Sequence, residues 1–188
     1  MKLVVLFVFA CLTAVAKEPA VQISKDPLSS EQIAIYKDFL AGFGDEDKDH
    51  RFVLNLVDTT IPLSINASDR DGCASDIVAN GGLAGIVVHR FPAEMKSADL
   101  RLVDRKHKVS DPGDAIRRGA PVENAVVAGF ASAILTFSEI AFDKQHRTAA
   151  FSYSFVCGRL CGHGGLVIYE LQNGKWSRSK RDCASWIS

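Results

Sequence analysis

The sequence lacks an excess of charge of either sign. Its 188 residues hold 22 Lys and Arg against 22 Asp and Glu, and the pI is about 6.9. Binding to nucleic acid or to an anionic membrane generally relies on a strongly positive surface. The composition therefore indicates neither partner. Hydrophobic residues at 47% and charged residues at 23% are typical of a folded globular chain.

Recognisable catalytic motifs are also missing. The chain has no Gly-x-Ser-x-Gly, no His-Glu-x-x-His and no paired catalytic carboxylates. Glycines in 81–85 lack the spacing of a phosphate-binding loop. The acidic run 45–51 resembles the start of a calcium loop, but His50 stands where such a loop needs Gly and Leu56 where it needs Glu. We expect no cofactor and lean against an enzyme, although a hydrolase built from dispersed Asp, His and Ser stays open.

Long hydrophobic runs are absent after the first residues. The run from Leu3 to Leu12 follows Lys2 and is followed by Ala14-Val15-Ala16, which is the small-x-small pattern of a signal-peptidase site. The run is too short to span about 30 Å of hydrocarbon as a helix. The sequence therefore predicts a signal peptide over 1–16, a mature chain over 17–188 that is secreted or periplasmic, and no integral membrane segment after cleavage.

Export changes how the five cysteines are interpreted. Cys11 leaves with the signal peptide, and an even number of four remains for disulfides in an oxidising compartment. We expect Cys157 to pair with Cys161 across a short Gly-rich turn, and Cys73 to pair with Cys183 across a long loop. Pairing of Cys161 with Cys183 and of Cys73 with Cys157 is the alternative.

The segment 157–165 concentrates two thiols, an imidazole and four glycines. A disulfide between Cys157 and Cys161 is the interpretation that export favours. A copper or zinc site built from Cys157, Cys161, His163 and Cys183 is a second, with a spacing that no standard site has. A cysteine nucleophile with His163 as its base is a third, but no orienting third group accompanies it.

Helical spacing is clearest near the N-terminus. Ser29 and Gln32 form a capping-box pattern, and Tyr36, Leu40 and Phe43 then recur on one face. The middle of the chain is more weakly patterned. There the sequence predicts short strands over 52–57, 83–88 and 100–103, a helix starting at Asp111-Pro112, and a helix over 122–131.

The last third predicts a four-stranded antiparallel meander over 133–188. Its expected strands are Ile134–Phe142, Thr148–Cys157, Leu166–Leu171 and Lys175–Asp182. Asn173-Gly174 is a strong signal for a type I′ hairpin turn. We therefore expect a single α+β domain, with the N-terminal and central helices packed on one face of the meander. Trp176 and Trp186 are expected in the core.

Several segments together resemble a known family. They are Leu135 to Asp143 (LTFSEIAFD), Cys157 to Gly162 (CGRLCG), Asn173 to Trp176 (NGKW), the terminal Ser185 to Ser188 (SWIS), and the helix and strand end from Tyr36 to Thr60. This set resembles an uncharacterised family of secreted bacterial proteins with an "lSxvgFn … CGxLCG … GxW … WIS" pattern. The resemblance implies export and a β-rich C-terminal region, and it implies no activity.

Two hypotheses for function follow. The first is a secreted or periplasmic non-catalytic domain that binds a protein partner or a small-molecule ligand. The second is a metal-binding or thiol-redox protein that uses Cys157, Cys161 and His163. Free thiols in the mature chain would favour the second, and their absence the first.

Overall fold

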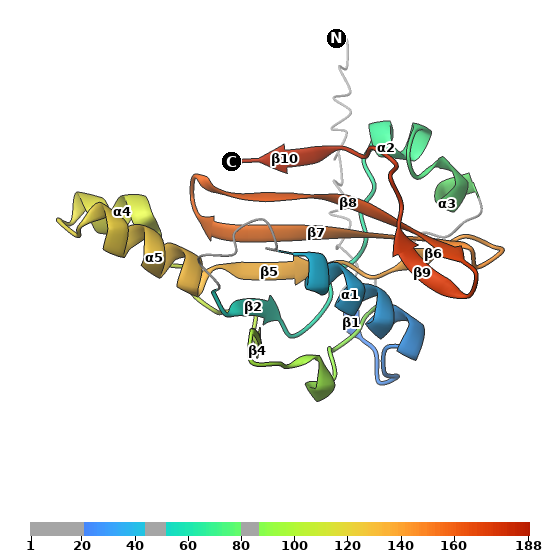
Figure 1. The fold of residues 1–188 in the computed structure, drawn as a ribbon, viewed down its shortest axis with the longest axis horizontal. Coiled ribbons are helices and arrows are strands. Elements are labelled where there is room, and N and C mark those ends of the chain that lie inside the picture. The colour runs from blue at the N-terminus through green and yellow to red at the C-terminus, as the bar shows by residue number, and fades with distance from the viewer. Residues whose placement is uncertain (1–20, 44–51, 80–86) are drawn as a thin grey trace, which may run out of the picture.

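The computed structural model describes residues 21–43, 52–79 and 87–188 (Figure 1). The expected signal peptide, the acidic run 45–51 and the glycines of 81–85 lie outside the described residues. The helices are α1 (Ser30–Gly42), α2 (Ala67–Asp71), α3 (Ser75–Ala79), η1 (Ala93–Met95), α4 (Pro112–Arg117) and α5 (Val122–Ser132). The strands are β1 (Gln22–Ile23), β2 (Leu54–Val57), β3 (Val87–Val88), β4 (Leu100–Val103), β5 (Ile134–Phe137), β6 (Ala141–Phe142), β7 (Thr148–Gly158), β8 (Cys161–Gln172), β9 (Lys175–Arg178) and β10 (Ser185–Ile187). Within the described ranges, no helix has the length and apolar character needed to cross a membrane.

The architecture is α+β, built on a curled sheet that is mostly antiparallel (Figure 1). The strand order is β10-β8-β7-β5-β2-β4, with β6 also paired to β7 and β9 to β8. Strands β5 to β10 pair antiparallel, whereas β2 is parallel to both of its neighbours, β5 and β4. Strands β1 and β3 form a separate parallel pair. The expected α+β class is thus present, and the parallel strands were not expected.

Helix α1 begins as the sequence predicts. The Ser29 side chain accepts from the Gln32 backbone N–H, and the Gln32 side chain accepts from that of Ser29, which completes the capping box. Its buried face is formed by Ile35, Tyr36 and Phe39, which pack on the central strands. The predicted helices after Asp111 and over 122–131 are likewise confirmed as α4 and α5.

Helices cover both faces of the sheet, so the expectation of one covered face is wrong. Side chains alternate along β7, so that Ala149 and Phe151 face the cluster beneath α1 while Ala150 faces the other side. There Ala150 packs in a second cluster that includes Ile77 of α3 and Ala74, the residue before that helix. The weakly patterned middle of the chain therefore supplies a second layer.

The predicted strand Ile134–Phe142 is interrupted. It divides into β5 and β6, because the intervening backbone turns to bond with the segment after β2. The Ile61 N–H donates to the Phe137 carbonyl at 2.9 Å, and the Glu139 N–H donates to the Ile61 carbonyl at 2.7 Å. This exchange draws the Glu139 side chain into the interior, where it is 3% exposed.

Of the other three predicted meander strands, Thr148–Cys157 is present as β7 with one residue more, and the last two have different bounds. Strand β8 begins at Cys161 instead of Leu166, since its glycines continue the ladder with β7 and with β10. Strand β9 ends at Arg178, because the chain then turns so that Arg181 can pair with Asp76 and Glu170. The four-stranded meander is therefore modified by the added strand β10, which pairs beside β9 on the same edge of β8.

The two tryptophans do not share an environment. Trp176 is buried at 8% exposure, and its Nε1 donates to Glu31 Oε1 at 2.6 Å. Trp186 in β10 is 42% exposed and its indole lies across Gly162 and Gly164 of β8. The expectation is confirmed for Trp176 and wrong for Trp186, because the glycines provide a flat surface at the sheet edge and no enclosing wall.

Replacing Tyr36 with Phe should lower the free energy of unfolding by about 1–2 kcal/mol, the cost of leaving a buried acceptor unpaired. The Tyr36 hydroxyl is fully buried and donates to the Ser138 carbonyl at 2.6 Å. Burial, followed by the charge of Glu139, raises the pKa of Tyr36, so the hydroxyl stays protonated. Chemical denaturation measures the effect. Tyr153→Phe is the matched control, because that hydroxyl makes only a long 3.3 Å contact, and an equal loss in both variants would contradict the assignment.

Replacing Gly174 with Val should destabilise the β8–β9 hairpin by about 1 kcal/mol or more. Asn173 and Gly174 have φ of 52° and 75°, the left-handed values of a type I′ turn, and a β-branched residue resists them. Thermal unfolding measures the loss. Asn173→Gly serves as the control that keeps the turn, and unchanged stability of Gly174→Val would show that the turn tolerates another geometry.

Candidate functional site

A turn closed by two cysteines joins β7 to β8. The Cα atoms of Cys157 and Cys161 lie 5.1 Å apart, which is disulfide distance. Leu160 occupies the tip of this turn and is 89% exposed. The segment that the sequence singled out thus presents an apolar side chain to solvent, on a short closed loop.

The same turn is held against the start of α4. Asp111, the N-cap of α4, accepts the Arg159 N–H on Oδ2 at 2.7 Å and the Asp114 N–H on Oδ1 at 2.9 Å. The hydrogen bond from the Arg159 N–H has the larger effect and that from the Asp114 N–H the smaller, and both lower the pKa of the Asp111 carboxyl group. The ionised form therefore holds the turn, and this contribution to stability is lost as the pH falls through the lowered pKa. The turn and α4 form one unit at ordinary pH.

Small residues allow helix α5 to pack closely against α4 and the end of β7. Its buried positions are Ala125 and Gly129, one helical turn apart. A Cβ at Gly129 would lie 2.6 Å from Cγ of Pro112 and 3.1 Å from the Cys157 carbonyl oxygen. Only glycine at this position lets α4 and the end of β7 approach so closely. The inner face of α5 therefore carries the small side chains.

The large apolar residues of this helical pair face outward. Val122 is 61% exposed, Val127 46%, Val126 38% and Phe130 37%, while Ile116 of α4 is 39% exposed. Helix α4 has no buried residue. A surface helix normally turns its large apolar residues to the core, so this arrangement is inverted. These five residues form what we term the α4–α5 surface, on helices that extend past the end of the sheet (Figure 1).

The two helices of the α4–α5 surface carry few ionisable side chains. Glu123 is the one ionisable residue in α5, and α4 adds Asp114 and Arg117, which pair with each other. Phe130 stacks on Phe52 and on the core residue Phe155, with ring centroids 5.5 and 6.4 Å apart, so its ring is partly exposed and has a fixed orientation. Exposed apolar side chains that gather on one surface are a common feature of sites where proteins contact other molecules.

His163 lies within an aromatic group on the face of the sheet that α1 covers. Its ring stacks on Phe43, with centroids 5.7 Å apart, and its Nδ1 lies 3.3 Å from the Tyr153 hydroxyl. Phe155 lies beside it at 5.4 Å. These contacts give His163 a packing role at the end of α1.

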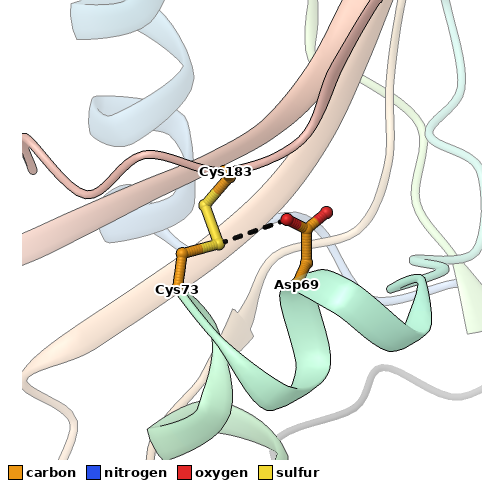
Figure 2. Close-up of side chains that lie close together, drawn as sticks. All are labelled: Asp69, Cys73 and Cys183. Atoms are coloured by element: carbon orange, nitrogen blue, oxygen red, sulfur yellow. Dashed lines mark hydrogen bonds between the residues drawn. A yellow bond between two sulfur atoms is a disulfide. The ribbon is translucent and has the colours of Figure 1, made fainter.

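The second cysteine pair ties α2 and α3 to the C-terminal segment (Figure 2). The Cα atoms of Cys73 and Cys183 are 5.5 Å apart, at disulfide distance, with 110 residues of separation. Asp69 lies beside them, 4% exposed, and its Oδ1 accepts the Ala184 N–H at 2.7 Å and lies 3.5 Å from the Cys73 sulfur. A disulfide sulfur carries no proton, so this last approach is a contact without a shared hydrogen. Asp69 thus anchors the C-terminal segment through the backbone.

The four residues of the metal alternative do not gather around one point. Of the part of the chain that the structure describes, Asp69, Cys73 and Cys183 are the one group of three metal-ligating side chains within 4.8 Å of one another. Cys157 and Cys161 face each other at the start of β8, Cys183 packs near its middle, and His163 lies among aromatic rings. Sulfurs joined in a disulfide are not thiolates and are not available as ligands.

The outward face of α5 was not foreseen from the sequence. A helix over 122–131 is predicted, but its valines and phenylalanine read equally well as a core face. Ala125 and Gly129 give the missing signal, since two small residues one turn apart mark the face that approaches another backbone closely. Comparison of the chain with protein-family models, with curated proteins and with solved structures found no match.

Non-reducing peptide mapping of the mature chain should find no free thiol and two linked pairs, Cys73 with Cys183 and Cys157 with Cys161. The double variant Cys73→Ser/Cys183→Ser should lose about 4–5 kcal/mol of stability, because it opens a loop of about 110 residues. The matched variant Cys157→Ser/Cys161→Ser should lose about 2 kcal/mol. A peptide that joins Cys73 to Cys157 or Cys161, or four free thiols with bound zinc or copper, would refute the pairing.

Proposed function

We propose that the protein is an exported, non-catalytic domain that binds a protein partner through the α4–α5 surface. The observation that carries the proposal is the inverted helix α5, whose small residues face the protein and whose large apolar residues face solvent. Each square ångström of apolar surface left in water forgoes about 25 cal/mol. A partner that covers these side chains recovers that free energy.

The chemistry of the surface fits the centre of a protein interface. Such centres are depleted of charge and enriched in aromatic and aliphatic side chains. Phe130 provides a large ring with an orientation set by Phe52, and Val126 and Val127 flank it on the same helix. Glu123 lies in the first turn of α5. A charge at the rim of an interface helps to orient the partner as it approaches.

The surface is also pre-organised. Asp111 joins the start of α4 to the Cys157–Cys161 turn, and Gly129 holds α5 against Pro112. Binding to a surface that is already ordered costs less conformational entropy. The helical pair is therefore ready to receive a partner without first folding.

Export belongs to the same proposal. Its supports are the N-terminal run with Ala14-Val15-Ala16, and two cysteine pairs at disulfide distance. Disulfides persist in secreted and periplasmic proteins. The partner is accordingly expected in the same compartment.

Site-specific photo-crosslinking tests the proposed surface. A benzophenone amino acid at Val127 should link the mature protein to one partner of defined mass in the extracytoplasmic fraction of its host. The same group at Gln172, exposed at the far end of β8, is the positional control. Adding Val126→Asp should reduce the Val127 crosslink about tenfold or more, because an unpaired carboxylate would be buried in an apolar contact.

The variant Val126→Asp should fold, since the side chain is exposed, and circular dichroism checks this. A crosslink of equal yield at Val127 and Gln172 would contradict the proposal, as would a crosslink that Val126→Asp leaves unchanged. A crosslinked product of twice the chain's own mass, together with dimerisation in sedimentation, would identify the partner as a second copy.

A further inference from the structure

A cleft lies at the carboxyl ends of the parallel strands β2 and β4. It consists of two adjoining hollows of about 350 and 380 Å³, both lined by Asp58, Arg90 and Asp104. Asp58 follows β2 directly and Asp104 follows β4 directly. Ligands of open α/β sheets bind at the carboxyl ends of parallel strands, and both hollows at this end are open to solvent.

Of the two arginines that line the first hollow, Arg105 is the one that no carboxylate pairs in the described part of the chain. Its Nε donates to Thr59 Oγ1 at 3.0 Å and its Nη2 donates to the Thr60 carbonyl at 2.6 Å. Among the described residues, Arg105 forms an ion pair with no carboxylate, whereas Arg90 is paired with Asp58. The guanidinium is thus held in place by neutral groups, with its other N–H donors directed to no acidic side chain. A guanidinium so fixed matches the planar geometry of a carboxylate.

A buried polar network makes this part of the cleft rigid. Glu139 accepts the Thr60 hydroxyl, and its Oε1 accepts the His89 backbone N–H at 2.8 Å. The His89 ring Nδ1 lies 2.9 Å from Glu139 Oε2. Thr60, which is fully buried, is therefore held by this network, while the neighbouring Thr59 is 4% exposed and forms a β-bridge with Arg90. The Thr60 carbonyl that accepts from Arg105 therefore belongs to a residue that this network holds in place.

The first hollow also has an apolar wall. Val21 and Ile23 line it and are 47% and 53% exposed. Asp58 and Asp104 line the same hollow, so a doubly charged phosphate would meet about twice the repulsion from these carboxylates that a singly charged group meets. We infer that this cleft binds a small organic monocarboxylate, whose carboxylate group Arg105 holds and whose hydrocarbon end lies against Val21 and Ile23.

NMR titration of the isotope-labelled mature protein tests the inference. Acetate, butanoate and hexanoate should each shift the Arg105 side-chain Nε–H signal in a saturable manner. Affinity should rise by about threefold per added CH₂, as the hydrocarbon end covers the apolar wall. Butylamine and inorganic phosphate, tested at the same concentrations, should give no saturable shift at Arg105.

Matched variants distinguish binding in the cleft from a general effect of the protein's positive charge. Arg105→Gln should weaken butanoate binding about tenfold or more, because the charged fork is lost. Arg101→Gln removes an exposed arginine on β4, whose side chain the cleft does not use, and should leave binding unchanged. Ile23→Ala keeps Arg105 and Val21 and should weaken the dependence on chain length, so the inference is tested even if Arg105→Gln fails to fold. An absent Arg105 shift with all three acids, equal binding of phosphate, or equal effects of Arg105→Gln and Arg101→Gln would overturn the inference.

Discussion

The packing of one aromatic side chain, Tyr36, connects the main parts of the molecule. Its ring stacks on Phe137 of β5, with centroids 5.2 Å apart and planes at 3°, and meets the edges of Phe91 and Phe151 at the same distance. Helix α1, the central strands and the segment after β3 therefore share one cluster. Offset-stacked and edge-to-face pairs of this kind add to the free energy of burial. Without α1, the apolar face of β5 and β7 would be left in water.

The hydroxyl of the same residue links this apolar cluster to the polar interior. It donates to the Ser138 carbonyl, at the point where β5 ends and the backbone turns toward Ile61. That turn brings Glu139 inward to Thr60 and His89. The break in the strand is therefore not a defect of an otherwise regular meander. It joins the antiparallel part of the sheet to the segment that follows the parallel strand β2, and it holds Thr60, whose carbonyl accepts from Arg105.

Prediction from the sequence succeeds where a few neighbouring residues determine the local structure. The capping box at Ser29, the proline start of α4 and the Asn173-Gly174 turn each depend on a few neighbouring residues, and each is present. The sequence predicts less where distant segments decide. Nothing near Glu139 in the chain indicates that Thr60 and His89 will receive its carboxylate. The same holds for Trp186, whose exposure depends on two glycines of another strand.

The α4–α5 surface also depends on contacts between distant segments that the sequence does not reveal. A helical pattern in residues 122–131 is visible in the sequence, but periodicity alone cannot say which side of a helix faces the protein. Pro121 precedes α5 without any side-chain cap, so the helix is not positioned by its start. Its orientation follows from sterics at Gly129, where Pro112 and the Cys157 carbonyl leave no room for a Cβ. The close approach on that side turns Val126 and Phe130 outward, and so the smallest residue of α5 determines which of its large residues are available to a partner.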